Sequence, residues 1–234
     1  MNTQVLTRRP HFRDKNFIPP LENGDHLTQQ EFHRRYEAMP ENVKAELING
    51  VVYMSSPVRV KNHGKPHSLV MSCFGVYFLS TKGVMLLDNT TLIVSDKHEP
   101  QPDVILRIEE KNGGRSKVND KDYLEGAPEL IVEIASSTAS YDLYDKLEMY
   151  QQKGVQEYIV WRVLDGRIDW FSLEGGTYQR LTTNKLGIVE SKVFPGLRLN
   201  IKALLNDEMD VVLSDLQIGL RSKKHREFVR KLAK

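Results

Sequence analysis

Four charged side chains, widely separated along the chain, could together hydrolyse a phosphodiester bond. Glu133 interrupts the apolar stretch 130–135, where an ionised carboxylate persists only if it is paired with a cation or bound to a metal, unless it is protonated. Glu46 and Asp103 precede it, and Lys146 follows it. Carboxylates that converge repel each other unless a divalent cation neutralises them, and hard oxygen ligands suit Mg²⁺ or Mn²⁺. A nearby lysine can orient or deprotonate water, or hold a phosphate oxygen.

Each of these residues alone also has an ordinary structural explanation. Glu133 could face water from an edge strand, although the stretch shows no polar alternation. Asp103 follows Pro102, a pair that is common in turns. Glu46 could be a surface acid, and Lys146 could belong to an exposed helix face. The hypothesis of one site therefore rests on the set and not on any single member.

Turn and capping signals predict the elements of the first half of the chain. Thr28 and Glu31 form a capping box that begins a helix, and Pro40 ends its apolar stripe. Asn49-Gly50 between two apolar runs predicts a hairpin over residues 45–54. Apolar residues at helical spacing predict a second helix from Pro66, ended by Gly83.

The second half reads as short strands with one buried strand among them. We expect strands over 84–87, 91–94 and 103–106, then a polar, mobile segment over 110–121. The run 130–135 is typical of a central strand buried on both faces, and a helix over 141–153 follows it. Asp165-Gly166 predicts a second hairpin. Further strands are expected over 178–181, 187–192 and 197–200, with helices to the end.

These elements predict an α/β fold, a mixed β-sheet flanked by helices, in a single domain with a C-terminal helical extension. We expect an irregular N-terminal arm over 1–26, the main domain over 27–206, and a basic helical segment over 207–234. From Arg221 to Lys234 there are seven Lys or Arg and one Glu. This tail either meets a polyanion or is a solvated end.

Composition excludes several classes of protein. No apolar run approaches the length of a membrane helix, and the first residues carry no apolar signal segment. The single cysteine, Cys73, rules out an internal disulfide framework and a cysteine-rich zinc site. We therefore expect a cytoplasmic protein without a membrane partner.

The motifs around the four charged residues resemble a known group of nucleases. Pro102-Asp103, followed by Glu133 on a core strand, is similar to the PD-(D/E)XK superfamily, except that Ala135 replaces its in-strand lysine. Over roughly residues 28–204 the chain resembles one branch, the Uma-type (Uma two) restriction-endonuclease-like family. The motifs that carry this resemblance occur in order at 45–50, 101–104, 130–137, 142–150, 154–158 and 194–197.

The resemblance implies a restriction-endonuclease-like fold and a metal-dependent endonuclease that cuts DNA. Asp103, Glu133 and the backbone carbonyl of Ile134 are expected to hold one Mg²⁺ (or Mn²⁺). Lys146 takes the place of the in-strand lysine and positions or activates the attacking water, while Glu46 aligns the outer shell of the metal. A homodimer is expected, since two sites cut two strands most simply. The basic segment 221–234 is a candidate for phosphate contacts.

The segment from His63 to His67 also resembles the family. Gly64 and Pro66 disfavour a continuous helix through both histidines, and no Glu follows His63, so a zinc site of the HExxH kind is not expected. His67 could contact a phosphate near a helix start, or be a hydrogen-bonded structural residue.

Two other functions stay open from the sequence. A catalytically weak DNA-binding module could keep the nuclease scaffold, and Ala135 is the argument for it. Alternatively, the acids could be structural in a non-enzymatic oligomeric scaffold.

Overall fold

The centre of the molecule is a six-stranded mixed sheet. The computed structural model describes residues 17–54, 59–136 and 143–233. The strand order across the sheet is β11 (Thr177–Arg180), β10 (Arg167–Glu174), β9 (Glu157–Arg162), β8 (Leu130–Ala135), β5 (Val104–Ile108) and β3 (Val84–Asp88). Strands β8 and β9 are parallel, and the other neighbouring pairs are antiparallel.

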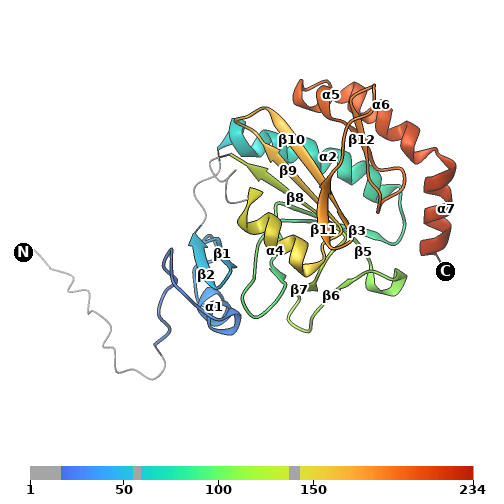
Figure 1. Cartoon of the computed structure of the whole chain (residues 1–234). Helices are drawn as coiled ribbons and strands as arrows, with labels where there is room; N and C mark the ends of the chain where they lie inside the picture. Colours follow the sequence, from blue (N-terminus) through green and yellow to red (C-terminus); the bar gives the residue numbers. More distant parts are fainter. Residues whose placement is uncertain (1–16, 55–58, 137–142, 234) are drawn as a thin grey trace, which may run out of the picture.

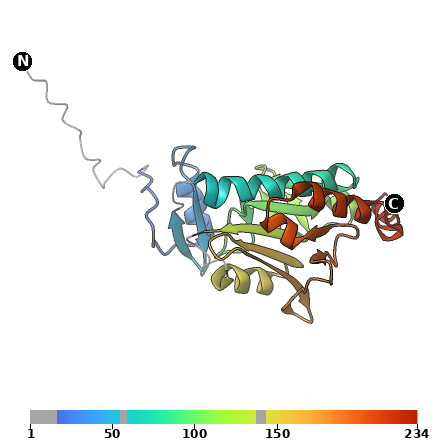
Figure 2. The same ribbon diagram turned by 90° about the horizontal axis from the view of Figure 1, so that it is seen from above.

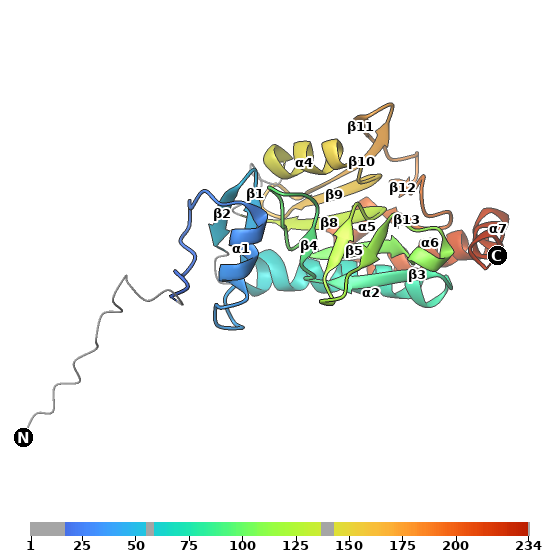
Figure 3. The same cartoon turned by 90° about the horizontal axis from the view of Figure 1, so that it is seen from below.

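Helices α2 (Lys65–Leu79) and α4 (Asp145–Lys153) cover opposite faces of this sheet (Figures 2 and 3). All six residues of β8 are buried, as expected for a strand covered on both faces. Val132 and Ile134 belong to the core that contains the α2 residues, and Ile131 and Ala135 to the core beneath α4. Successive side chains of a strand alternate between faces, so Glu133 lies on the α4 face.

A small N-terminal unit lies at one end of the sheet (Figure 1). It contains α1 (Gln29–Tyr36) and the hairpin of β1 (Ala45–Ile48) and β2 (Val51–Met54), with a small core of its own. Asn49 and Gly50 have φ values of 55° and 76°, the left-handed conformation that an Asn-Gly hairpin turn requires. The backbone of Leu47 exchanges two hydrogen bonds with that of Glu99, which joins the unit to the loop before β5.

The remaining strands form two small sheets. One contains β4 (Leu92–Ile93), β7 (Leu124–Gly126) and β6 (Ser116–Val118), and the other contains β12 (Ile188–Glu190) and β13 (Arg198–Asn200). The C-terminal helices are α5 (Ile201–Leu205), α6 (Met209–Leu220) and α7 (Lys223–Leu232). They lie at the end of the molecule opposite the N-terminal unit (Figure 1). None of the described helices is long and apolar enough to span a membrane.

Most of the expected elements are present, with three corrections. Residues 110–121 do not form a uniformly polar, mobile segment, because a short 3₁₀ helix (Glu110–Asn112) and β6 lie within it. Buried Arg107 anchors this region through the side chain and carbonyl of Ser116. The second helix ends at Leu79, before Gly83. The helix α4 after β8 runs over Asp145–Lys153, Leu143 before it is helical as well with a turn at Tyr144 between them, and residues 137–142 lie outside the described ranges.

Candidate active site

Lys146 joins two of the predicted acids. Its Nζ atom lies 2.9 Å from Oε1 of Glu133 and 2.9 Å from Oε1 of Glu46. Glu133 and Lys146 are each only 4% exposed. Glu133 therefore does not face water from an edge strand, and Lys146 does not belong to an exposed helix face. The three residues come from β8, α4 and β1, which brings together positions up to 100 residues apart. The structure thus places these three side chains in contact, and their roles stay a prediction.

Helix α4 and the N-terminal hairpin hold this arrangement of side chains in place. Lys146 lies in the first turn of α4, and Tyr150, one turn further along, donates a hydrogen bond from its hydroxyl to Oε1 of Glu133 at 3.2 Å. A spacing of four residues places both side chains on one helix face. Oε1 of Glu46 also accepts a hydrogen bond from the backbone N–H of Gln101 at 2.7 Å. The N-terminal unit thus presents Glu46 to Lys146, beside the central strand β8.

Asp103 lies directly before β5, beside Glu133 on the neighbouring strand. Val104 pairs with Val132 in the antiparallel ladder, so the register continues with Asp103 opposite Glu133, about 5 Å away between backbones. Oδ2 of Asp103 accepts the backbone N–H of Ile134 at 2.7 Å. The Asp103 side chain therefore accepts a backbone hydrogen bond from β8 just before β5 begins.

Two histidines contact Asp103, His63 from just before α2 and His67 from its first turn. Nε2 of His63 lies 2.9 Å from its Oδ1 atom, and Nε2 of His67 lies 3.2 Å from its backbone carbonyl oxygen. The two rings stack at 5.7 Å. Although burial raises the pKa of Asp103, the hydrogen bonds from His63 and Ile134 and the charge of Lys146 outweigh it, and its pKa lies below the ordinary value.

A single π-helical turn, Val60–Gly64, leads into α2 and carries His63 to Asp103. Such turns are rare and are found often at functional sites. His63 is the site residue that sequence reasoning missed, because it considered His63 only as one half of a zinc pair. The expectation that Gly64 and Pro66 interrupt the helix between the two histidines is wrong, because the π turn continues directly into α2 and Pro66 lies in the first turn, where no N–H is needed. His67 also contacts Oδ1 of Asp88 at 3.0 Å, and its proposed contact with a phosphate stays a prediction.

The oxygen donors resemble part of a metal site. Within residues 17–54, 59–136 and 143–233, no group of three or more His, Cys, Asp or Glu side chains is arranged as a metal cage. Asp103 and Glu133 nevertheless supply two buried carboxylates on adjacent strands. These are the hard donors that Mg²⁺ takes with waters and substrate phosphates, without an all-protein cage.

The family of the chain follows from its match to a known set of sequences. Residues 29–202 match the Uma2 family, described as "putative restriction endonuclease". This match covers well over half of the chain and includes Glu46, Asp103, Glu133 and Lys146. The chain belongs to the Uma2 family. The resemblance identified from the sequence motifs is thus confirmed.

The fold of this Uma2 protein is also found in a solved structure. A crystal structure described as a "putative nuclease" from Anabaena variabilis matches with a TM-score of 0.59 at 15% sequence identity. The match covers 77% of this chain and 98% of the other. The search of curated proteins found no match. The predicted restriction-endonuclease-like α/β fold is confirmed.

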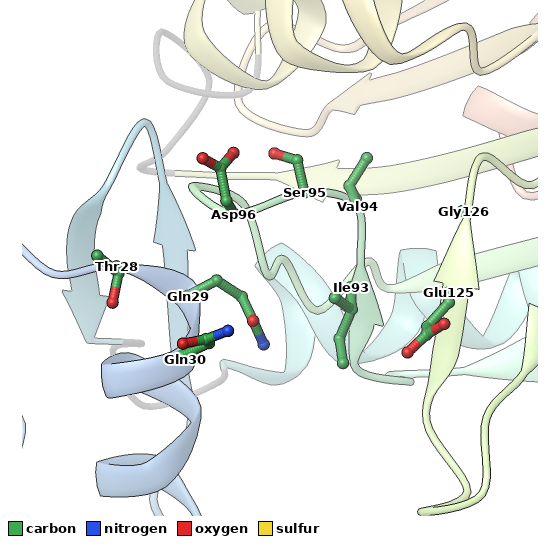
Figure 4. A pocket seen from close by; sticks show the side chains of 9 residues that line it. All are labelled: Thr28, Gln29, Gln30, Ile93, Val94, Ser95, Asp96, Glu125 and Gly126. Carbon is green, nitrogen blue, oxygen red and sulfur yellow. The ribbon is translucent and has the colours of Figure 1, made fainter.

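We call Glu46, Asp103, Glu133 and Lys146 the charged cluster. A cavity of about 580 Å³ lies outside it (Figure 4). It lies between the start of α1, the strand β4 with the turn after it, and β7. It shares no residue with the cluster, and Asp96 and Glu125 are its charged lining residues. Because both are acidic, this cavity has no favourable charge for a phosphate, and we assign it no part in the site.

The basic C-terminal segment lies away from the cluster. In α7, His225 contacts Thr81 just past the end of α2, whereas His67 lies in the first turn of that helix. At 1.5 Å per residue the two positions are about 20 Å apart. The segment 221–234, predicted as a source of phosphate contacts, therefore does not line the candidate active site, at least through its described residues 221–233.

Proposed function

We propose that this Uma2 protein is a metal-dependent endonuclease that hydrolyses phosphodiester bonds in DNA. The observation that carries this proposal is the position of Lys146 between Glu46 and Glu133, at 2.9 Å from each, beside the strand that begins after Asp103. A buried amine between two carboxylates beside the central strand is a costly arrangement. It fits a site that must bind a phosphate and a water molecule.

Asp103, Glu133 and the backbone carbonyl of Ile134 are the groups that would hold Mg²⁺ or Mn²⁺. When bound there, the divalent cation would offset the negative charge that develops on the phosphate in the transition state. The hydrogen bonds from Ile134 and His63 hold the Asp103 carboxylate in one orientation and in its charged form. Preorganised acids of this kind need little rearrangement when substrate binds.

Lys146 would orient the attacking water or a phosphate oxygen through its ammonium group. Two carboxylates at hydrogen-bond distance favour its ammonium form, so the lysine acts as a donor more readily than as a base. Glu46, bound to Lys146 and to the N–H of Gln101, holds the amine in place. This role differs from the outer metal shell predicted from the sequence, and it is our preferred assignment. His67 stays a candidate phosphate contact.

The broader organisation is part of the same proposal. We assign residues 27–206 to the nuclease domain, with an N-terminal arm over 1–26 and a C-terminal helical segment over 207–234. A homodimer would bring two sites to the two strands of a duplex. A cytoplasmic location agrees with the single cysteine, Cys73, which is buried.

The test is cleavage of supercoiled plasmid DNA in the presence of Mg²⁺ or Mn²⁺. The wild type should nick or linearise the plasmid, and D103N, E133Q and K146M should each lose at least about 100-fold in rate. Lys153→Met on the same helix is the matched control and should keep wild-type activity. Light scattering of the purified chain would report the dimer separately.

The same assay separates the proposal from its alternative. A wild type that binds DNA but leaves it intact with both metals would make the chain a catalytically weak DNA-binding module, and the enzyme proposal would be wrong. Cleavage that persists unchanged in D103N and E133Q would equally remove these residues from the mechanism.

A further inference from the structure

Three arginines surround one buried aspartate on the β9–β10 hairpin and β11. Asp169 is 3% exposed. Nε of Arg162 lies 3.0 Å from its Oδ2 atom, Nε of Arg167 lies 3.0 Å from its Oδ1 atom, and Arg180 also contacts Oδ1. Arg162 pairs in addition with Asp165 at 2.7 Å. We call these three arginines and Asp169 the arginine cluster.

The sheet register places this cluster beside the candidate active site. Val160 pairs with Glu133 on one side and with Asp169 on the other. The three residues lie in one row across β8, β9 and β10, and paired residues of adjacent strands point to the same face. Two strand spacings separate Glu133 from Asp169, about 10 Å between backbones.

Arg162 and Arg167 lie opposite each other near the C-terminal ends of β8 and β9. Arg162 pairs with Ala135 and with Arg167. Their row lies two residues beyond Glu133, on the same face of the sheet as α4, because side chains two apart in a strand share a face. The arginine cluster thus lies on the same face of the sheet as the charged cluster, and near the same end of β8.

The arginine cluster has more N–H donors and more positive charge than Asp169 requires. The side chains of Arg167 and Arg180 are 45% and 46% exposed, which leaves them accessible to a ligand. A guanidinium has five N–H donors, so a contact with one carboxylate leaves most of them available. Three guanidiniums also exceed what the buried Asp169 needs, and the five charged groups, including Asp165, sum to +1.

We propose that the arginine cluster binds the phosphodiester backbone of the nucleic acid on one side of the bond that is cut. The proposal rests on the proposed nuclease function. Guanidinium forks match the oxygens of a phosphate, and Asp169 holds them in orientation. A span of about 10 Å corresponds to roughly three base steps at 3.4 Å each along one strand. The cluster would therefore hold a phosphate a few nucleotides from the one at Lys146.

The test compares two variants that remove the same charge from different places. R167Q/R180Q removes two exposed arginines of the cluster, and K223Q/K224Q removes two exposed lysines of α7. Binding of a short fluorescein-labelled DNA duplex is measured by anisotropy in EDTA over a series of salt concentrations. We expect R167Q/R180Q to bind about tenfold more weakly and with a salt slope lower by about 1 to 2. K223Q/K224Q should change neither quantity to that extent.

Further outcomes keep the inference distinct from the nuclease proposal. R167K/R180K keeps the charge without the planar fork and should bind with intermediate affinity. Thermal melting of each variant checks that it is folded. Equal weakening by R167Q/R180Q and K223Q/K224Q would overturn the inference, as would full affinity in a folded R167Q/R180Q. Arginine-dependent binding by a wild type that does not cleave would support the inference and reject the nuclease proposal.

Discussion

The Nζ atom of Lys146 and the Oε1 atom of Glu133 lie 2.9 Å apart, and both side chains are almost fully buried. The pair joins the end of the central strand β8 to the first turn of α4. Burying two charges costs several kcal/mol each, which their attraction repays only with good geometry and further hydrogen bonds. Tyr150 and Glu46 supply such contacts. The pair is thus a sensitive point for stability as well as for the proposed cleavage reaction.

Replacing Lys146 with Met should destabilise the fold. The substitution keeps most of the side-chain volume but leaves Glu133 and Glu46 without their shared cation, and breaking a buried pair by removing one partner costs about 3 to 5 kcal/mol. Urea denaturation should show the loss as a lower midpoint with an unchanged slope.

Two further variants test the cause of this loss. E133Q/K146M also removes the charge of Glu133, one of the two carboxylates that K146M leaves unpaired. It should therefore be more stable than K146M alone. Lys153→Met, in the last turn of α4, should shift the midpoint far less. Equal midpoints for K146M and the wild type would mean that the ion pair contributes nothing to stability.

The central part of this site could be predicted because its signals are local. Glu133 stands out as one acid among apolar neighbours, and Asn49-Gly50 and Gly154 mark a turn and a helix end directly in the sequence. The burial of all of β8 follows from its composition. The distance between Lys146 and Glu133 is also a short-range consequence, since a strand and the helix after it pack together.

Other contacts of the site depend on packing that the sequence does not display. His63 reaches Asp103 because a π-helical turn precedes α2, and no periodicity predicts that turn. The arginine cluster forms across three strands whose register is known only once they pair. Residues 110–121 are mostly polar, yet buried Arg107 and Glu129 form hydrogen bonds with the backbone of this segment. In each case a long-range partner decides the structure.

His63 should affect cleavage as a positioning residue. His63→Ala removes a hydrogen bond to Oδ1 of Asp103 and should slow plasmid cleavage about tenfold, less than D103N, because the carboxylate itself remains. His63→Gln can still donate a hydrogen bond and should keep more of the activity. His26→Ala, on the exposed N-terminal segment, is the control. A rate for His63→Ala equal to that of His26→Ala would remove His63 from the site.

Divalent cations should stabilise the folded chain through Asp103 and Glu133. A ligand that binds only the native state adds about 2.7 kcal/mol at 100 times its Kd, so saturating Mg²⁺ or Mn²⁺ should raise the melting temperature by several degrees. Chelation with EDTA should reverse the shift. D103N and E133Q should show little shift, and the same shift in these variants would place the cation elsewhere.

Glu157 should make stability fall as pH rises toward neutrality. This carboxyl on β9 is fully buried, and burial raises its pKa to about 7 although Ser191, the N–H groups of Lys192 and Val193, and Trp170 donate hydrogen bonds to it. The ordinary pKa is 4.5. A raised pKa means that the folded chain holds its proton more tightly than the unfolded chain. The stabilisation is then complete below pH 4.5 and is lost as pH rises through about 7.

The size of this effect and its control follow from the same shift. One pKa unit corresponds to about 1.4 kcal/mol, so the free energy of unfolding should fall by up to about 3 kcal/mol over this window. Urea denaturation at several pH values measures it. In E157Q no proton is exchanged at this position, so the difference in stability between wild type and E157Q should change with pH by this amount. A difference that stays constant from pH 4.5 to above 7 would show that Glu157 remains ionised when buried, held by its four hydrogen-bond donors.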